Sequence, residues 1–76
     1  MKLISTLRLT TSLNKAVTTI SENCTMSQAF AMIENWCNDN NAQLPSPVNI
    51  YKSGGCVRVH VVTRDQKYIN LFDIKD

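Results

Sequence analysis

A single segment of the chain has the apolar spacing of a long α-helix, and it limits what the remaining residues can build. Thr25 is the predicted N-cap, and Gln28 three residues later completes the pattern of a capping box. The residues that recur at helical spacing and form one apolar stripe are Met26, Ala29, Phe30, Ile33, Trp36 and Cys37. Short polar side chains at 38–41 are expected to end the helix, because asparagine tolerates the left-handed conformation of a C-cap.

The other segments alternate apolar and polar residues with the period of two that is typical of strands. The predicted strands are residues 2–10, 16–20, 48–52, 56–62 and 67–74. The predicted turns and loops are residues 11–15, 45–47, 53–55 and 63–66. A solitary helix covers only one face of a sheet. We therefore predict an α+β fold, an antiparallel sheet of four to five strands with one α-helix packed on one face, in the order β-β-α-β-β-β.

Length and composition set the class of protein. The chain has 76 residues, enough for one domain spanning 1–76, and its 43% hydrophobic and 18% charged residues are typical of globular chains. A net charge of +2 neither requires nor excludes a nucleic-acid partner. No apolar run approaches the ~20 residues of a membrane-spanning helix, and the first residues lack the apolar core of a secretory signal. We expect a cytoplasmic protein that makes no membrane contact.

The residues that could carry chemistry are few and scattered. Cys24, Cys37 and Cys56 are an odd number of thiols at wide spacing, and His60 is the only histidine. A closed zinc site usually takes four such ligands, so we expect reduced thiols, no metal and no cofactor. Cys56 and His60 lie four residues apart on one predicted strand, about 13 Å at ~3.3 Å per residue, which is too far for a nucleophile and its base. We predict that the protein is not an enzyme.

The register of the last hairpin decides which residues face the helix. If its loop holds an even number of residues, Asn70 and Phe72 join the valines of segment 56–62 beneath the helix. If the number is odd, Ile69 and Leu71 take those positions. Burying an unpaired amide costs about 1–3 kcal/mol. We therefore predict the odd loop, with Asn70 and Phe72 on the face that the helix leaves open.

On that register the open face combines aromatic rings with cationic side chains. The predicted partner-binding residues are Arg8, Tyr51, Arg58, His60, Tyr68 and Phe72. Such a surface suits a protein interface, in which tyrosine, phenylalanine and arginine are favoured anchors. An exposed edge strand is the alternative docking site for a partner protein, because its unpaired backbone groups allow strand addition. The open face also suits single-stranded nucleic acid, whose bases stack on aromatic rings. A third alternative is a homodimer that packs this face against a second copy, and a fourth is that the loop 38–47 covers it.

Two parts of the chain support a resemblance to known proteins: the helix start, Thr25-Met26-Ser27-Gln28-Ala29, and the strand-rich region 48–74. Their order resembles that of small phage-encoded proteins that disable host machinery, among them RNA polymerase inhibitors and anti-CRISPR proteins. The resemblance implies stoichiometric binding that blocks a host protein complex in the host cytoplasm, without a catalytic motif. The near-neutral charge differs from the strong acidity of the members that mimic DNA.

Overall fold

The computed structural model describes residues 1–11 and 16–76, so most of the predicted turn at 11–15 lies outside the described residues. The elements are β1 (Lys2–Leu9), β2 (Ala16–Ser21), α1 (Met26–Asp39), the 3-10 helix η1 (Pro47–Asn49), β3 (Ile50–Ser53), β4 (Cys56–Val62) and β5 (Tyr68–Lys75). The strands form one antiparallel sheet in the order β2-β1-β5-β4-β3. This confirms the predicted α+β fold.

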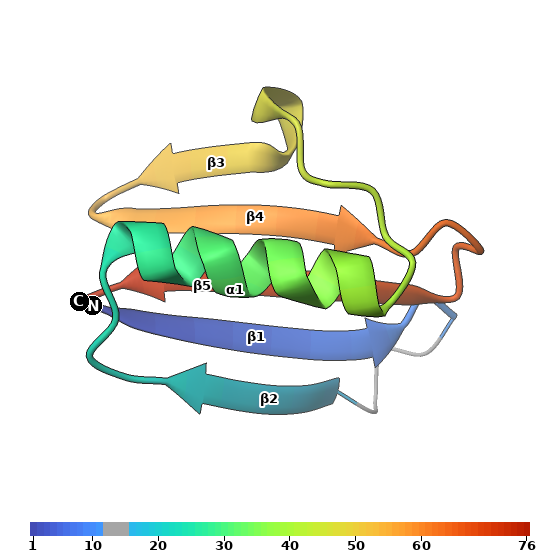
Figure 1. Ribbon diagram of the computed structural model, residues 1–76, viewed down its shortest axis with the longest axis horizontal. Coiled ribbons are helices and arrows are strands. Elements are labelled where there is room, and N and C mark those ends of the chain that lie inside the picture. The colour runs from blue at the N-terminus through green and yellow to red at the C-terminus, as the bar shows by residue number, and fades with distance from the viewer. Residues whose placement is uncertain (12–15) are drawn as a thin grey trace.

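Helix α1 lies across one face of the sheet, over its middle strands, while β2 and β3 form the two edges (Figure 1). The predicted capping box closes its first turn: the Gln28 amide N–H donates to Thr25 Oγ1 at 3.1 Å, and the Thr25 amide donates to Gln28 Oε1 at 2.9 Å. At the other end the backbone N–H and the side-chain Nδ2 of Asn40 both donate to the Trp36 carbonyl. Asn41 then adopts a φ of +53°, so the asparagine run ends the helix as predicted.

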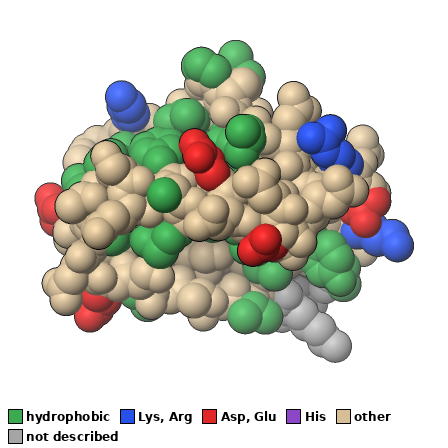
Figure 2. All heavy atoms as spheres, viewed as in Figure 1, with side chains coloured by type: hydrophobic (Ala, Val, Ile, Leu, Met, Phe, Trp, Pro, Cys, Tyr) green, Lys and Arg blue, Asp and Glu red, His purple; other side chains and the backbone are tan. Residues whose placement is uncertain are grey.

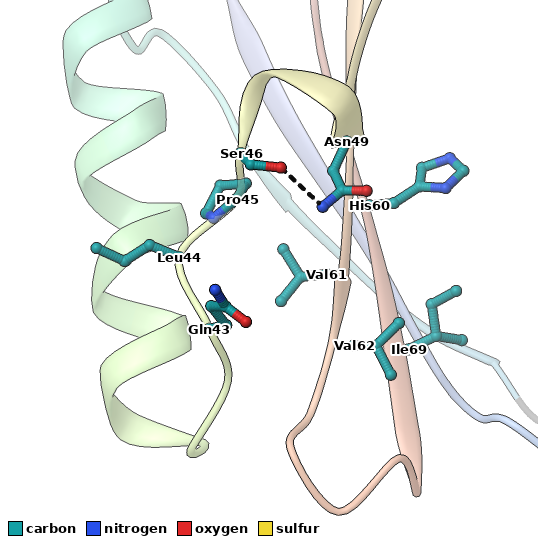
Figure 3. A pocket seen from close by; sticks show the side chains of 9 residues that line it. All are labelled: Gln43, Leu44, Pro45, Ser46, Asn49, His60, Val61, Val62 and Ile69. Carbon is teal, nitrogen blue, oxygen red and sulfur yellow. Dashed lines mark hydrogen bonds between the residues drawn. The ribbon is translucent and has the colours of Figure 1, made fainter.

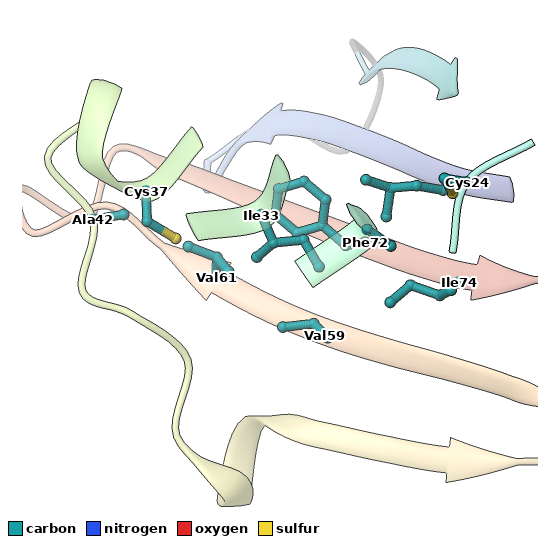
Figure 4. Packing of buried hydrophobic residues seen from close by; sticks show 10 residues of the cluster. Cys24, Ile33, Cys37, Ala42, Val59, Val61, Phe72 and Ile74 are labelled. Carbon is teal, nitrogen blue, oxygen red and sulfur yellow. The ribbon is translucent and has the colours of Figure 1, made fainter. Parts of the chain in front are cut away.

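The core lies between α1 and the middle of the sheet (Figure 4). Its buried residues are Leu3, Cys24, Ala29, Ile33, Cys37, Ala42, Val59, Val61, Phe72 and Ile74. Ala29, Ile33 and Cys37 form the centre of the predicted helical stripe, and the rest of that stripe packs against the core while partly exposed. The rings of Trp36 and Phe72 meet edge to face, with centroids 5.9 Å apart.

The predicted register of the last hairpin is wrong. Thr63 N–H donates to the Tyr68 carbonyl, which leaves an even loop of residues 64–67, and Val61 pairs with Asn70. Asn70 is therefore fully buried beneath α1. The expected penalty assumed an amide with no partner, but Ser5 Oγ donates to Asn70 Oδ1 at 2.9 Å, so the carbonyl half of the amide is paired.

The hairpin's own turn favours this even register. The Asp65 carboxylate accepts from Thr63 Oγ1 at 2.6 Å and from the Lys67 amide at 3.0 Å. The Tyr68 amide donates back to Thr63 Oγ1, and Gln66 takes a φ of +62°. These contacts hold the turn in one conformation, and the period of two along β5 carries that choice to every residue after it.

The start of the third strand also differs from the prediction. Residues 48 and 49 belong to η1, and β3 begins at Ile50. Pro47 stands in the first turn of η1, where its missing N–H and fixed φ are tolerated, and the Asn49 amide donates to the Ser46 carbonyl. Val48 is therefore exposed on a turn, and β3 is a short edge strand of four residues.

Candidate functional site

The sheet face opposite α1 is the candidate site, and it carries four of the six residues predicted for it. Because side chains alternate along a strand, the register places Arg8, Arg58 and His60 on this face. Tyr51 pairs with Arg58 across β3 and β4 and joins them. We call this surface the open face.

The prediction that Tyr68 and Phe72 also lie on the open face is wrong, because it rested on the odd register. Phe72 pairs with Val59 and is only 2% exposed, in the core beneath α1. Tyr68 points to the helix side, is 42% exposed, and lines a shallow cavity with Trp36. The open face therefore lacks two of its three predicted aromatic rings.

Apolar side chains that were not among the predicted site residues occupy the centre of the open face. They are Ile4 on β1, Ile69 and Leu71 on β5 and Val62 on β4, and Ile20 extends the patch to the edge strand β2. The signal for two of them was present in the sequence, since residues 68–74 are apolar on both sides of the strand. Ile20 is 55% exposed, and the others are half-buried or exposed. A contiguous apolar patch on a small protein is typical of an interaction site.

Cationic side chains lie beside this apolar centre on β1, β4 and β5. Among the described strand residues, the open face carries the cations Lys2, Arg8, Arg58 and Lys75 and the carboxylate of Asp73. Arg58 holds Asp73 through two hydrogen bonds, Nε to Oδ1 at 2.7 Å and Nη2 to Oδ2 at 3.1 Å. This bond to the carboxylate raises the pKa of the Arg58 guanidinium.

The opposite side of the molecule has a different charge. Helix α1 contains Glu34 and Asp39 and no lysine or arginine. Figure 2 views this side and shows acidic side chains over its middle, with the lysine and arginine side chains toward its margins. The protein is therefore electrically asymmetric, with a net positive open face and a net negative helix.

The Tyr51 and His60 side chains form the aromatic part of the open face. Their ring centroids are 4.9 Å apart, with the planes tilted by 52°. Both rings stand near the β3 edge, because β3 is the outermost strand on that side. They flank the apolar centre and do not form a row along the sheet.

A cavity of about 390 Å³ opens beside these rings at the edge of β4 (Figure 3). β3 reaches only to Ile50, opposite Val59, and the next β-pairing along this edge is the bridge between Ala42 and Thr63. Between them the segment 43–49 arches away from β4. Its lining residues are Gln43, Leu44, Pro45, Ser46, Asn49, His60, Val61, Val62 and Ile69.

Alternate backbone groups of β4 point toward its outer edge. Thr63 N–H points to β5, where it bonds Tyr68, whereas Arg64 N–H bonds Asn41 on the other side. Alternate residues of a strand direct their amide and carbonyl groups to opposite edges. The N–H and C=O groups of His60 and Val62 therefore point toward this edge of β4, on the side of the segment 43–49.

The thiols do not form a reactive cluster. Burial, together with the nearby Glu34, raises the pKa of the Cys37 thiol. Cys24 is buried, and Cys56 stands on the open face with Sγ 3.9 Å from Asp73 Oδ1. Within residues 1–11 and 16–76, no three His, Cys, Asp or Glu side chains gather as metal ligands, and no helix is long and apolar enough to cross a membrane.

Comparison with known proteins supplies no relative. No protein-family model, no curated protein and no solved structure matches this chain.

Proposed function

We propose that this protein is a non-catalytic binding protein that docks a partner protein on its open face. The observation that carries the proposal is the apolar centre of that face, uncovered by any described element and bordered by cations on β1, β4 and β5. Removing such a surface from water is favourable, at about 25 cal/mol per Å² of apolar area. The charged rim adds orientation and speed to the association.

The size of the open face is sufficient for a specific complex. The molecule measures 30 × 24 × 21 Å, and the sheet lies across the two longer dimensions. A face of this size approaches the ~800 Å² that each partner buries in a standard protein interface. A partner that covered most of the face would therefore reach a stable area without any rearrangement of the fold.

The charge and the apolar side chains of the open face indicate what kind of partner surface it fits. Four cations against the single carboxylate of Asp73, among the described strand residues, favour an acidic partner surface. The apolar centre favours exposed apolar side chains in the middle of that surface. By occupying such a surface on a larger host complex, the protein would act stoichiometrically, as an inhibitor or modulator of that complex.

Single-stranded nucleic acid is the weaker candidate. Binding of that kind uses aromatic rings as stacking platforms along a basic groove. With Phe72 in the core and Tyr68 on the helix side, the open face offers Tyr51 and the His60 ring at one end. Arg58 is already engaged by Asp73. The apolar residues at the centre of the face have no role in contacting phosphates.

The test compares capture by three forms of the tagged protein in a lysate of the cells that contain it. The wild type is compared with the open-face variant Ile4→Ser/Leu71→Ser and with the control Asn35→Ser, whose side chain is exposed on α1. Captured proteins are identified by mass spectrometry. The acidic protein that the wild type captures and the open-face variant does not is then purified, and its binding is measured by calorimetry. We expect one-to-one binding that the open-face variant loses and the control keeps.

Two outcomes would overturn the proposal. If the open-face variant binds the purified partner as tightly as the wild type does, the docking surface lies elsewhere. If the wild type instead binds a labelled oligothymidylate with an affinity that falls steeply with salt, the partner is nucleic acid. Thermal unfolding of each variant confirms that a loss of binding is not a loss of fold.

A further inference from the structure

Strand β2 is an exposed edge of the sheet with none of the features that normally block strand addition. It pairs with β1 on one side, and no other described strand pairs with its outer side. Five of its six residues are exposed, with Val17 64% and Ile20 55% accessible. Its sequence, Ala-Val-Thr-Thr-Ile-Ser, contains no charge, proline or glycine. Edges of this kind are templates for pairing with another chain.

The opposite edge is protected in several of the usual ways. β3 has four residues, carries the charged Lys52, and is limited by Pro47 in the preceding turn and by Gly54 after it. Short length, lysine and proline are devices by which natural sheets prevent edge pairing. The two edges therefore differ in what their residues allow, and β2 alone offers a strand long enough for stable addition.

The hydrogen-bond pattern identifies the groups that β2 presents outward. The Thr10 amide bonds the Lys67 carbonyl, so the even-numbered residues of β1 bond β5 and the odd-numbered ones bond β2. Across that pair Val17, Thr19 and Ser21 bond β1. The backbone N–H and C=O groups of the remaining residues, Ala16, Thr18 and Ile20, point away from the sheet.

We infer that β2 pairs antiparallel with β2 of a second copy of this chain, joining two sheets into one of ten strands. The outward backbone groups of β2 are equally spaced on either side of Thr18. A two-fold axis that passes between the Thr18 residues of the two copies therefore pairs each outward N–H with a C=O of the other copy. Thr18 then faces its own counterpart and Ala16 faces Ile20. All three outward residues make both of their backbone hydrogen bonds, giving six across the interface.

The side chains at this interface are compatible with themselves. On the open face, Thr18 lies against Thr18 and Ala16 against Ile20; on the helix face, Val17 lies against Thr19. Threonine pairs and β-branched pairs are favourable cross-strand neighbours. No like charges meet, because β2 has no charged residue. The pairing closes at two copies, since the β3 edge is blocked. This inference goes beyond the proposed function and does not depend on it.

Sedimentation velocity over a dilution series tests the inference with the intact protein. We expect the wild type to be a dimer that dissociates on dilution. Thr18→Lys places two ammonium groups opposite each other across the axis, and we expect it to remain monomeric over the whole concentration range. Thr18→Val keeps the backbone groups and the β-branched shape, and we expect it to dimerise as the wild type does. A monomeric wild type, or a Thr18→Lys variant that still dimerises, would refute the pairing.

Amide hydrogen exchange gives a second readout at single residues. In the wild type, we expect the amides of Ala16, Thr18 and Ile20 to become protected as concentration rises. The amides of Val17 and Thr19, which bond β1, stay equally protected at every concentration. In folded Thr18→Lys the outward amides exchange fast throughout. A dimer without added protection at those three amides would place the contact on another surface.

Discussion

Leu71 and Phe72 are consecutive residues of β5, yet they belong to two different environments. Phe72 is buried beside Val59 and packs against the Trp36 ring, whereas Leu71 is half-buried on the face that no described helix covers. Alternation along the strand separates the two faces but does not say which one the helix covers. That choice depends on the turn between β4 and β5, whose contacts are local to residues 63–68.

Each face also contains residues that are unusual for its environment. The covered face contains Asn70, whose Nδ2 has no hydrogen-bond partner among the described residues. The open face contains Ile4, Ile69 and Leu71 at its centre. Protein folding alone would not favour a buried Asn70 or these three apolar side chains on an uncovered face. An apolar surface that the fold leaves in water is what a binding partner would use.

The largest expected difference in unfolding free energy is between truncation of Phe72 and truncation of its neighbour Leu71. We expect Phe72→Ala to lower the free energy of unfolding by about 3–5 kcal/mol, because it leaves a cavity beneath α1. Leu71→Ala should cost about 1 kcal/mol, since its side chain stays partly in water. Urea denaturation measures both, with Phe72→Leu as the milder substitution if the alanine variant does not fold. Equal costs for Leu71→Ala and Phe72→Ala would contradict the assignment of faces.

The next largest expected effect on stability concerns the buried side-chain amide of Asn70. Ser5→Ala removes the donor to Asn70 Oδ1 and should destabilise the fold by about 1–3 kcal/mol, because both ends of the amide are then unpaired. Ser5→Ala combined with Asn70→Val should recover most of that loss, since neither polar group remains. Thr6→Ala, one residue along on the open face, is the control with a small effect. Additive losses in the double variant would mean that the hydrogen bond does not form.

The capping box at the start of α1 is expected to make a smaller contribution to stability. Thr25→Ala removes the oxygen that accepts from the Gln28 amide, and we expect a loss of about 1 kcal/mol in unfolding free energy. Ser27→Ala, two residues later and exposed, should change it by less than about 0.5 kcal/mol. Thermal melts followed by circular dichroism compare the two, and a cost as large for Ser27→Ala would argue against the capping box.

The smallest predicted effect is a pH dependence of the register-setting turn. Hydrogen bonds from Thr63 and from the Lys67 amide lower the pKa of Asp65 below its ordinary value of about 3.9. A lowered folded-state pKa means that the stabilisation is complete above the unfolded value and is lost as pH falls through the folded one. Asp65→Asn should therefore flatten the stability profile below about pH 4. An unchanged slope would show that the carboxylate does not hold the turn.

The helix and all five strands could be predicted from the sequence, because capping and alternation are local signals. The face of β5 that joins the core was mispredicted, because the turn at 63–68 sets it and the hydrogen bond that pairs the buried Asn70 carbonyl comes from Ser5, 65 residues away in the chain. The same error placed Tyr68 and Phe72 among the site residues. Arg8, Tyr51, Arg58 and His60 were placed correctly, since the valines of β4 and the leucines of β1 defined their side of the sheet.

Accessibility of methyl groups to a soluble gadolinium chelate tests the two-faced sheet most directly. In the free protein we predict strong relaxation enhancement for the methyls of Ile4, Ile69 and Leu71, and weak enhancement for those of Ile33 and Ile74. Adding the purified partner should then shield the first three and leave the other two unchanged. Strong enhancement at Ile74 with shielding at Leu71 in the free protein would mean that the helix covers the other face, and would contradict the account.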